Sequence, residues 1–180
     1  MKKILLATLV GLSLTAGAAV LKTDPAKTTV SATFKQMNVP VESKFKKHHV
    51  VIDYDAAKPD ASKATVEVDT ASLDMGDPEY NAEVAKKEWF NSAQYPKATF
   101  VSSSIKAAGA GKLTVTGKLT IKGKAADVTF PVTMKTEGGK QVFDGAVPIK
   151  RLTYNIGEGE WKDTGMVADE VTIKFHVVSQ

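Results

Sequence analysis

Four carboxylates in the middle of the chain are the residues that come closest to a catalytic or metal-binding set. Asp69, Asp74, Asp77 and Glu79 lie close together in the sequence, and such a group could bind calcium or supply a general acid and a general base. However, Asp77 is suited to cap a helix that begins at Pro78, and Glu79 would then lie at the positive end of the helix dipole. We therefore interpret the cluster as structural, with a carboxylate-based hydrolase as a rival hypothesis.

Other chemical groups are sparse. His48 and His49 are adjacent, so on a strand their side chains point to opposite faces, and His176 is expected on the solvent face of the last strand. The sequence contains no cysteine and no G-x-S-x-G motif, so it lacks a thiolate and a serine elbow. Gly157–Glu160 has the glycine spacing of a phosphate loop, but its acidic residues would repel phosphate. The sequence predicts no enzyme, metal site or cofactor.

Large apolar side chains are the stronger candidates for function. One set is expected on the inward faces of strands, and a second set on a helix and a late loop, where it would either cap the core or frame the mouth of a pocket. The wall candidates are Phe34, Phe45, Phe100, Leu119, Phe130 and Phe143, and the end candidates are Trp89, Phe90, Tyr154 and Trp161.

Antiparallel strands must position these side chains. Apolar and polar residues alternate over 112–122 and again over 127–135, after a turn at Lys122-Gly123-Lys124, which predicts a hairpin. We expect further strands near 29–34, 42–55, 64–68, 98–105, 143–149 and 171–177, with a bend at Pro40 and a helix over 77–90. Such one-faced strands favour a sandwich or a barrel, and a barrel of about eight strands can hold one small ligand.

Small residues and lysines have predicted places in this pattern. Ala32, Ala64, Gly117 and Gly145 are expected on inward faces, where they either let strands pack closely or leave space for a guest. The solvated outer surface is expected to carry Lys44, Lys46, Lys47, Lys118, Lys122 and Lys124.

The first eighteen residues have the pattern of a secretory signal. Lys2 and Lys3 precede an apolar run over 4–14 and the A-x-A site Ala16–Ala18, so residues 19–180 are expected to form one exported, periplasmic domain without a transmembrane segment. Removal of the two lysines lowers the net charge from +4 to +2. This weak charge argues against a nucleic-acid partner.

Several separated segments resemble the YceI-like family of bacterial lipid-binding and polyisoprenoid-binding proteins. Their order and spacing agree across essentially the whole chain after the signal. The segments are Lys35–Phe45 (KQMNVPVESKF), Lys87–Asn91 (KEWFN), Tyr95–Phe100 (YPKATF), Gly117–Gly123 (GKLTIKG) and Gly157–Asp163 (GEGEWKD). Asn38 and Ser43 stand where family members often have glycine, which leaves open the shape of the first bend.

The resemblance implies an all-β, lipocalin-like antiparallel barrel of about eight strands, with a short helical insertion and no enzymatic activity. It also implies a hydrophobic channel for an isoprenoid or acyl lipid. The Gly157–Trp161 run looks most like the branch found alongside b-type membrane cytochromes, which suits a quinone-like ligand or a cytochrome partner. We therefore expect a carrier for a polyisoprenoid or an isoprenoid quinone, with a fully packed envelope interaction module as the alternative.

Overall fold

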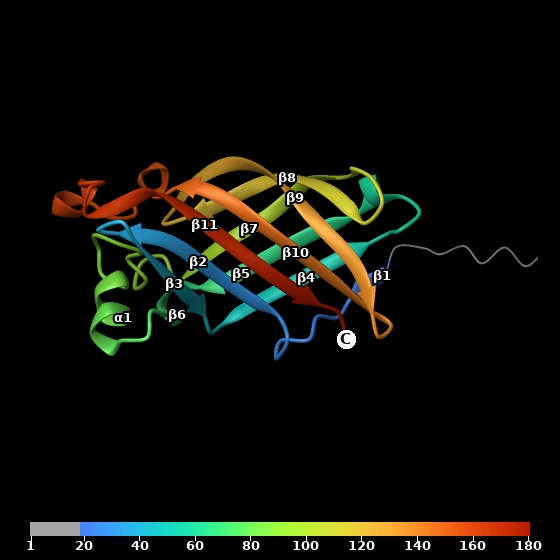
Figure 1. The fold of residues 1–180 in the computed structure, drawn as a ribbon, viewed down its shortest axis with the longest axis horizontal. Coiled ribbons are helices and arrows are strands. Elements are labelled where there is room, and N and C mark those ends of the chain that lie inside the picture. Colours follow the sequence, from blue (N-terminus) through green and yellow to red (C-terminus); the bar gives the residue numbers. More distant parts are fainter. Residues whose placement is uncertain (1–18) are drawn as a thin grey trace, which may run out of the picture.

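One antiparallel sheet forms nearly all of the structure, a computed structural model that describes residues 19–180 (Figure 1). Residues 1–18, where the sequence predicts a signal peptide, lie outside the described residues. The strands are β1 (Ala19–Leu21), β2 (Thr29–Gln36), β3 (Val39–Phe45), β4 (His48–Tyr54), β5 (Lys63–Asp69), β6 (Leu73–Asp74), β7 (Lys97–Ala107), β8 (Lys112–Ile121), β9 (Lys124–Glu137), β10 (Lys140–Lys150) and β11 (Val167–Val178).

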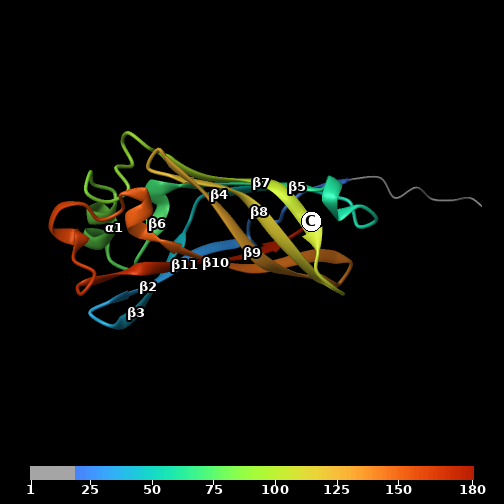
Figure 2. The ribbon, with the colours of Figure 1, turned by 90° about the horizontal axis from the view of Figure 1, so that it is seen from above.

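The strands follow one another in the order β1-β4-β5-β7-β8-β9-β10-β11-β2-β3-β6. The sheet curls so that β5 and β7 lie along one side and β2 and β11 along the other, with α1 (Pro78–Val84) at one end (Figures 1 and 2). Four short 3-10 helices, η1 (Pro59–Ala61), η2 (Thr70–Ser72), η3 (Arg151–Tyr154) and η4 (Gly159–Lys162), lie in the connections. The all-β, lipocalin-like prediction is confirmed, although the curled sheet has eleven strands in the described residues instead of about eight.

The predicted hairpin after Lys112 is β8 and β9, in which Val115 pairs with Phe130 and Leu119 with Ala126. Its turn is Lys122-Gly123, and both residues have positive φ, as in the two-residue turns that match the twist of a hairpin. A second turn of this kind joins β2 to β3 through Met37 and Asn38, with φ of 50° and 64°. Asparagine tolerates this left-handed conformation, so the first bend forms without the family's glycine.

The single strand predicted over 42–55 is wrong, because β3 and β4 are separate strands at opposite ends of the sheet order. β3 pairs with β2 and β6, whereas β4 pairs with β1 and β5. Lys46 and Lys47 break the run, and their backbone N–H groups donate to Ser72 instead of to a neighbouring strand. Alternation alone could not reveal this break, since the apolar side chains on both sides of it face the same interior.

The predicted helix over 77–90 is shorter in the structure. Asp77 caps it as expected and accepts hydrogen bonds from the backbone of Glu79 and Tyr80, but α1 ends at Val84. The backbone N–H of Phe90 then donates to the carbonyl of Val84, which folds the chain back. Trp89 and Phe90 therefore reach the interior from a turn rather than from a helix face.

Aromatic rings from neighbouring strands pack directly over the inward-facing glycines Gly117 and Gly145. A Cβ atom at Gly117 would lie 2.5 Å from the ring of Phe100 and 2.5 Å from the carbonyl of Val101, and one at Gly145 would lie 2.2 Å from the ring of Phe175. These glycines thus permit close packing of rings against the sheet, and they do not themselves leave open space.

We expect Gly117→Ala to lower the free energy of unfolding by about 1–3 kcal/mol, because the new methyl group would meet a backbone carbonyl that cannot move independently. Urea unfolding measures this change. Gly145→Ala is the matched control and should have a smaller effect, since only the Phe175 ring must shift. An equal or larger loss at Gly145 would contradict this account.

Two buried cations tie together the loops at the α1 end. Arg151 is only 2% exposed, and its five N–H groups donate to the carbonyls of Ile156, Gly157, Trp161, Val167 and Ala168. Lys122, predicted on the solvated surface, is instead buried, and its ammonium donates to the carbonyls of Lys87 and Asn155 and to the carboxylate of Glu158. Lys122 thereby joins three of the family-like segments.

Replacing Lys122 by methionine should lower the free energy of unfolding by about 2–4 kcal/mol, because two backbone carbonyls and Glu158 would lose their donor. Chemical denaturation provides the measurement. The control is Lys118→Met, whose pair with Asp127 is well exposed and whose loss should cost less than about 0.5 kcal/mol. Equal losses for the two variants would show that the Lys122 contacts contribute little.

Candidate functional site

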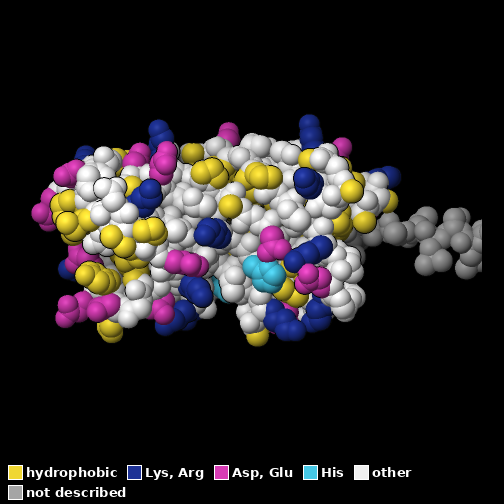
Figure 3. Space-filling view, in the orientation of Figure 1, with side chains coloured by type: hydrophobic (Ala, Val, Ile, Leu, Met, Phe, Trp, Pro, Cys, Tyr) yellow, Lys and Arg dark blue, Asp and Glu magenta, His cyan; other side chains and the backbone are white. Residues whose placement is uncertain are grey.

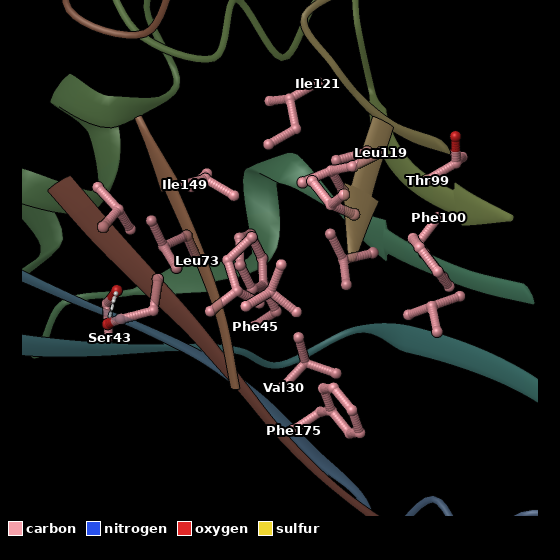
Figure 4. A pocket seen from close by; sticks show the side chains of 18 of the residues that line it. Val30, Ser43, Phe45, Leu73, Thr99, Phe100, Leu119, Ile121, Ile149 and Phe175 are labelled. Carbon is pink, nitrogen blue, oxygen red and sulfur yellow. Dashed lines mark hydrogen bonds between the residues drawn. The ribbon is translucent and has the colours of Figure 1, made fainter. Parts of the chain in front are cut away.

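The curled sheet encloses an apolar cavity of about 270 Å³ (Figure 4). Strands from all around the sheet contribute to its wall, including β2 with Val30, β7 with Phe100, β8 with Leu119 and β11 with Phe175. The close-up shows these side chains pointing into a shared space from opposite walls (Figure 4). Because the lining is almost wholly hydrocarbon, the cavity is suited to an apolar guest.

Nine of the ten residues proposed from sequence line this cavity. They are Phe34, Phe45, Trp89, Phe90, Phe100, Leu119, Phe130, Phe143 and Trp161. Tyr154 does not line it; this residue is 1% exposed and packs in the core at the α1 end, where burial raises the pKa of its hydroxyl. The geometry thus brings the candidates together, and their contact with a ligand stays a prediction.

Aromatic rings extend along the length of the cavity. Phe130 lies in the middle, with ring centroids 5.4 Å from Phe100 and 5.8 Å from Phe175. Tyr54 and Phe143 form an edge-on pair in the cluster away from α1. Phe175 and Tyr54 were not among the candidates, although each continues the alternating inward pattern of its strand.

The α1 end carries a second aromatic group. The rings of Trp89 and Trp161 lie 5.3 Å apart, Phe45 meets Phe90 edge-on, and the Arg151 guanidinium lies 5.8 Å from the Trp89 ring centroid. Backbone hydrogen bonds hold this arrangement, since the N–H groups of Gly157 and Glu158 both donate to the carbonyl of Glu88. Trp89, Phe90 and Trp161 therefore lie together as a packed group at the α1 end of the cavity.

Charge at the cavity wall is compensated. Of the charged residues that line it, Glu83 pairs with Lys86, and Arg151 uses its N–H groups on backbone carbonyls. Burial lowers the pKa of Arg151, and the nearby Asp169 opposes this shift. Because neither side chain has a free charge to offer, the wall is poorly suited to hold an anionic group inside.

The cavity reaches the surface beside α1. Tyr80 is one of its lining residues and is 55% exposed, and Met75 and Gln36 lie at the same end. Acidic and hydrophobic side chains gather on this end of the molecule, on the left in Figure 3. An entering guest would thus first meet α1 and the β2–β3 hairpin.

The carboxylate cluster has structural partners. Asp69 accepts from the backbone of Ala71, and Asp77 caps α1. Asp74 pairs with Lys46 at 2.8 Å, and its hydrogen bonds to Lys46, Asn81 and Gly76 lower its pKa to about 2. A general acid needs a raised pKa, so Asp74 is unsuited to that role.

The histidines have separate surroundings. His48 Nδ1 lies 3.3 Å from the carbonyl oxygen of Phe45, and His176 pairs with Asp144 at 2.6 Å. Within residues 19–180, no three histidine or acidic side chains come together in a way that could hold a metal ion. In the same range, no helix is both long and apolar enough to cross a membrane.

Solved structures share this fold. BcnA of Burkholderia cenocepacia is 55% identical, with a TM-score of 0.86 over 88% of this chain and 100% of that one. A Campylobacter jejuni YceI protein is 21% identical, with a TM-score of 0.69 over 100% and 99% of the two chains. A polyisoprenoid-binding domain of Saccharophagus degradans is 14% identical, with a TM-score of 0.70 over 91% and 99%. The last two show similarity of fold alone.

Sequence comparison gives the same assignment. A UPF0312 protein of Pseudomonas savastanoi is 35% identical over 98 residues, which are 54% of this chain and 51% of that protein. The match thus spans about half the length of this relative. The sequence pattern of the YceI-like domain matches residues 21–179, which include every strand from β2 to β11. The chain therefore belongs to the YceI-like family.

Proposed function

We propose that this protein binds and carries a long-chain amphipathic lipid, a polyisoprenoid or an isoprenoid quinone, through the periplasm. The observation that carries the proposal is the enclosed apolar cavity, which spans both hydrophobic clusters of the sheet. Membership of the YceI-like family supports it, as does the similar fold of a domain named for polyisoprenoid binding.

Burial of the lipid chain supplies the driving force. Removing apolar surface from water contributes about 25 cal/mol for each Å² to the binding free energy. Apolar side chains surround the cavity, so a bound chain would contact them on all sides. The cavity volume of about 270 Å³ lies just below the range of about 300–1,000 Å³ that is typical of pockets for small ligands. Binding of this kind requires no catalytic group.

The alternative from sequence is an interaction module with a fully packed interior, whose edges meet an envelope partner such as a b-type membrane cytochrome. The cavity weighs against full packing, because well-packed cores leave few voids larger than a water molecule. A cytochrome partner and the periplasmic location stay predictions from the resemblance and from the signal sequence.

A bound lipid should accompany the purified protein. We expect organic extraction of protein prepared from a bacterial periplasm, followed by mass spectrometry, to yield a stoichiometric prenyl or acyl species. Protein that is folded, free of lipid and unable to take up added isoprenoid would favour the interaction module instead.

Leu119→Trp should weaken lipid binding at least tenfold while the protein remains folded, because the larger side chain would enter the middle of the cavity from β8. Titration with a fluorescent isoprenoid measures affinity, and circular dichroism checks the fold. Thr114→Trp, on the outer face of the same strand, is the matched control and should bind normally. Unchanged affinity in folded Leu119→Trp protein would refute this placement of the ligand.

A further inference from the structure

A pair of aromatic rings crosses the interior at the end of the cavity away from α1. Tyr54 lies on β4 and Phe143 on β10, and four other strands separate these two strands in the sheet order. Their ring centroids nevertheless lie 5.6 Å apart, with the rings edge to face. Both side chains are buried and line the cavity. The contact therefore spans the inside of the curled sheet.

The other ring contacts between strands have a different geometry. Phe130 on β9 contacts Phe100 on β7 and Phe175 on β11, and in each case a single strand lies between the two. These rings lie beside one another along a wall. Among the ring pairs that the strands of residues 19–180 contribute, only Tyr54 and Phe143 join distant parts of the sheet.

The cavity ends at this pair. Tyr54 is the last residue of β4, and Phe143 is the lining residue of β10 that lies farthest from α1. On β11 the lining within the described residues ends at Val177, which is the sheet partner of Phe143. The cavity is therefore blind at this end, whereas at the α1 end it reaches the surface beside the exposed Tyr80.

Backbone hydrogen bonds fix the strands that carry the two rings. The N–H of Asp24 donates to the carbonyl of Val178 on β11, and the hydroxyl of Thr23 donates to the carbonyl of Val50 on β4. This segment joins β4 to β11, and β11 pairs with β10. A guest would have to break these bonds to spread the strands apart, so the blind end is a firm stop.

We propose that the Tyr54–Phe143 pair sets the length of the lipid chain that the cavity accepts. This inference rests on the proposed carrier function and adds chain-length selectivity to it. A chain that enters beside α1 extends until its leading end meets the pair, and any further prenyl units stay outside in water. Each unit inside the cavity contributes apolar burial to the binding free energy, and each unit outside contributes almost none.

Isoprenoid alcohols that differ by one prenyl unit measure this limit. Competition with a fluorescent isoprenoid gives the affinity of each alcohol, from the ten-carbon geraniol upward. We expect the affinity of the wild-type protein to rise about tenfold for each added unit up to a limiting length, and by less than about twofold for each unit beyond it.

Two substitutions should move the limit in opposite directions. Phe143→Ala removes one of the crossing rings and should lengthen the limit by about one prenyl unit. Ala64→Phe should shorten it by about one unit, because Ala64 lines the cavity beside Ile52, one inward position nearer to α1 than Tyr54. Successive inward positions lie about 7 Å apart along a strand, or about 5 Å along the axis of a tilted barrel, which is close to the length of one prenyl unit.

Phe175→Ala is the matched control, since it removes a ring of the same kind from the cavity wall outside the pair. Whatever its effect on the individual affinities, it should leave the limiting length unchanged. Ala64→Phe removes no packing, so the test does not depend on the stability of Phe143→Ala.

The outcomes separate this inference from the carrier proposal. A wild-type protein with no limiting length, or a limit that stays the same in folded Ala64→Phe protein, would overturn the inference and leave the carrier proposal intact. An equal shift in Phe175→Ala would also overturn it. Failure of every alcohol to bind would overturn both.

Discussion

The alternation of inward apolar and outward polar side chains is the constraint on which the rest of the structure depends. A shift of one residue in β8 would turn Leu119 to solvent and Lys118 into the interior, and the same holds for each long strand. Register is therefore fixed by the free energy of apolar burial. The cavity and the part of its aromatic lining that the strands contribute follow from this pattern.

The interior is only partly filled, because the lining rings are held apart by the sheet that carries them. Phe100 lies over Gly117 and Phe175 over Gly145, so these rings pack against their own wall. Phe130 bridges between them. The glycines thus act indirectly, because they let the rings lie close against the sheet and so leave more room between opposite walls.

The α1 end is stabilised differently, because it is formed mainly by loops and its backbone carbonyls are satisfied by side-chain donors. Backbone carbonyls that lack sheet partners need donors, and Arg151 and Lys122 donate seven hydrogen bonds to such carbonyls and one to the Glu158 carboxylate. This use of charge satisfies the backbone and leaves neither of these two cations free for a ligand. The same packing leaves the indole N–H of Trp89 without a protein partner. An interior of this kind is suited to hold a guest mainly by apolar contact.

The sequence by itself determined the all-β class, the β8–β9 hairpin and the cap at Asp77, and nine of the ten residues proposed from it line the cavity. Each of these depends on local signals, namely the period of two, turn residues and helix capping. Tertiary structure alone decided that residues 42–55 form two strands, that Lys122 is buried, that Tyr154 lies outside the cavity lining, and that Trp89 lacks a partner. These features depend on which distant carbonyls and rings meet a given side chain, and a local pattern carries no information about such encounters.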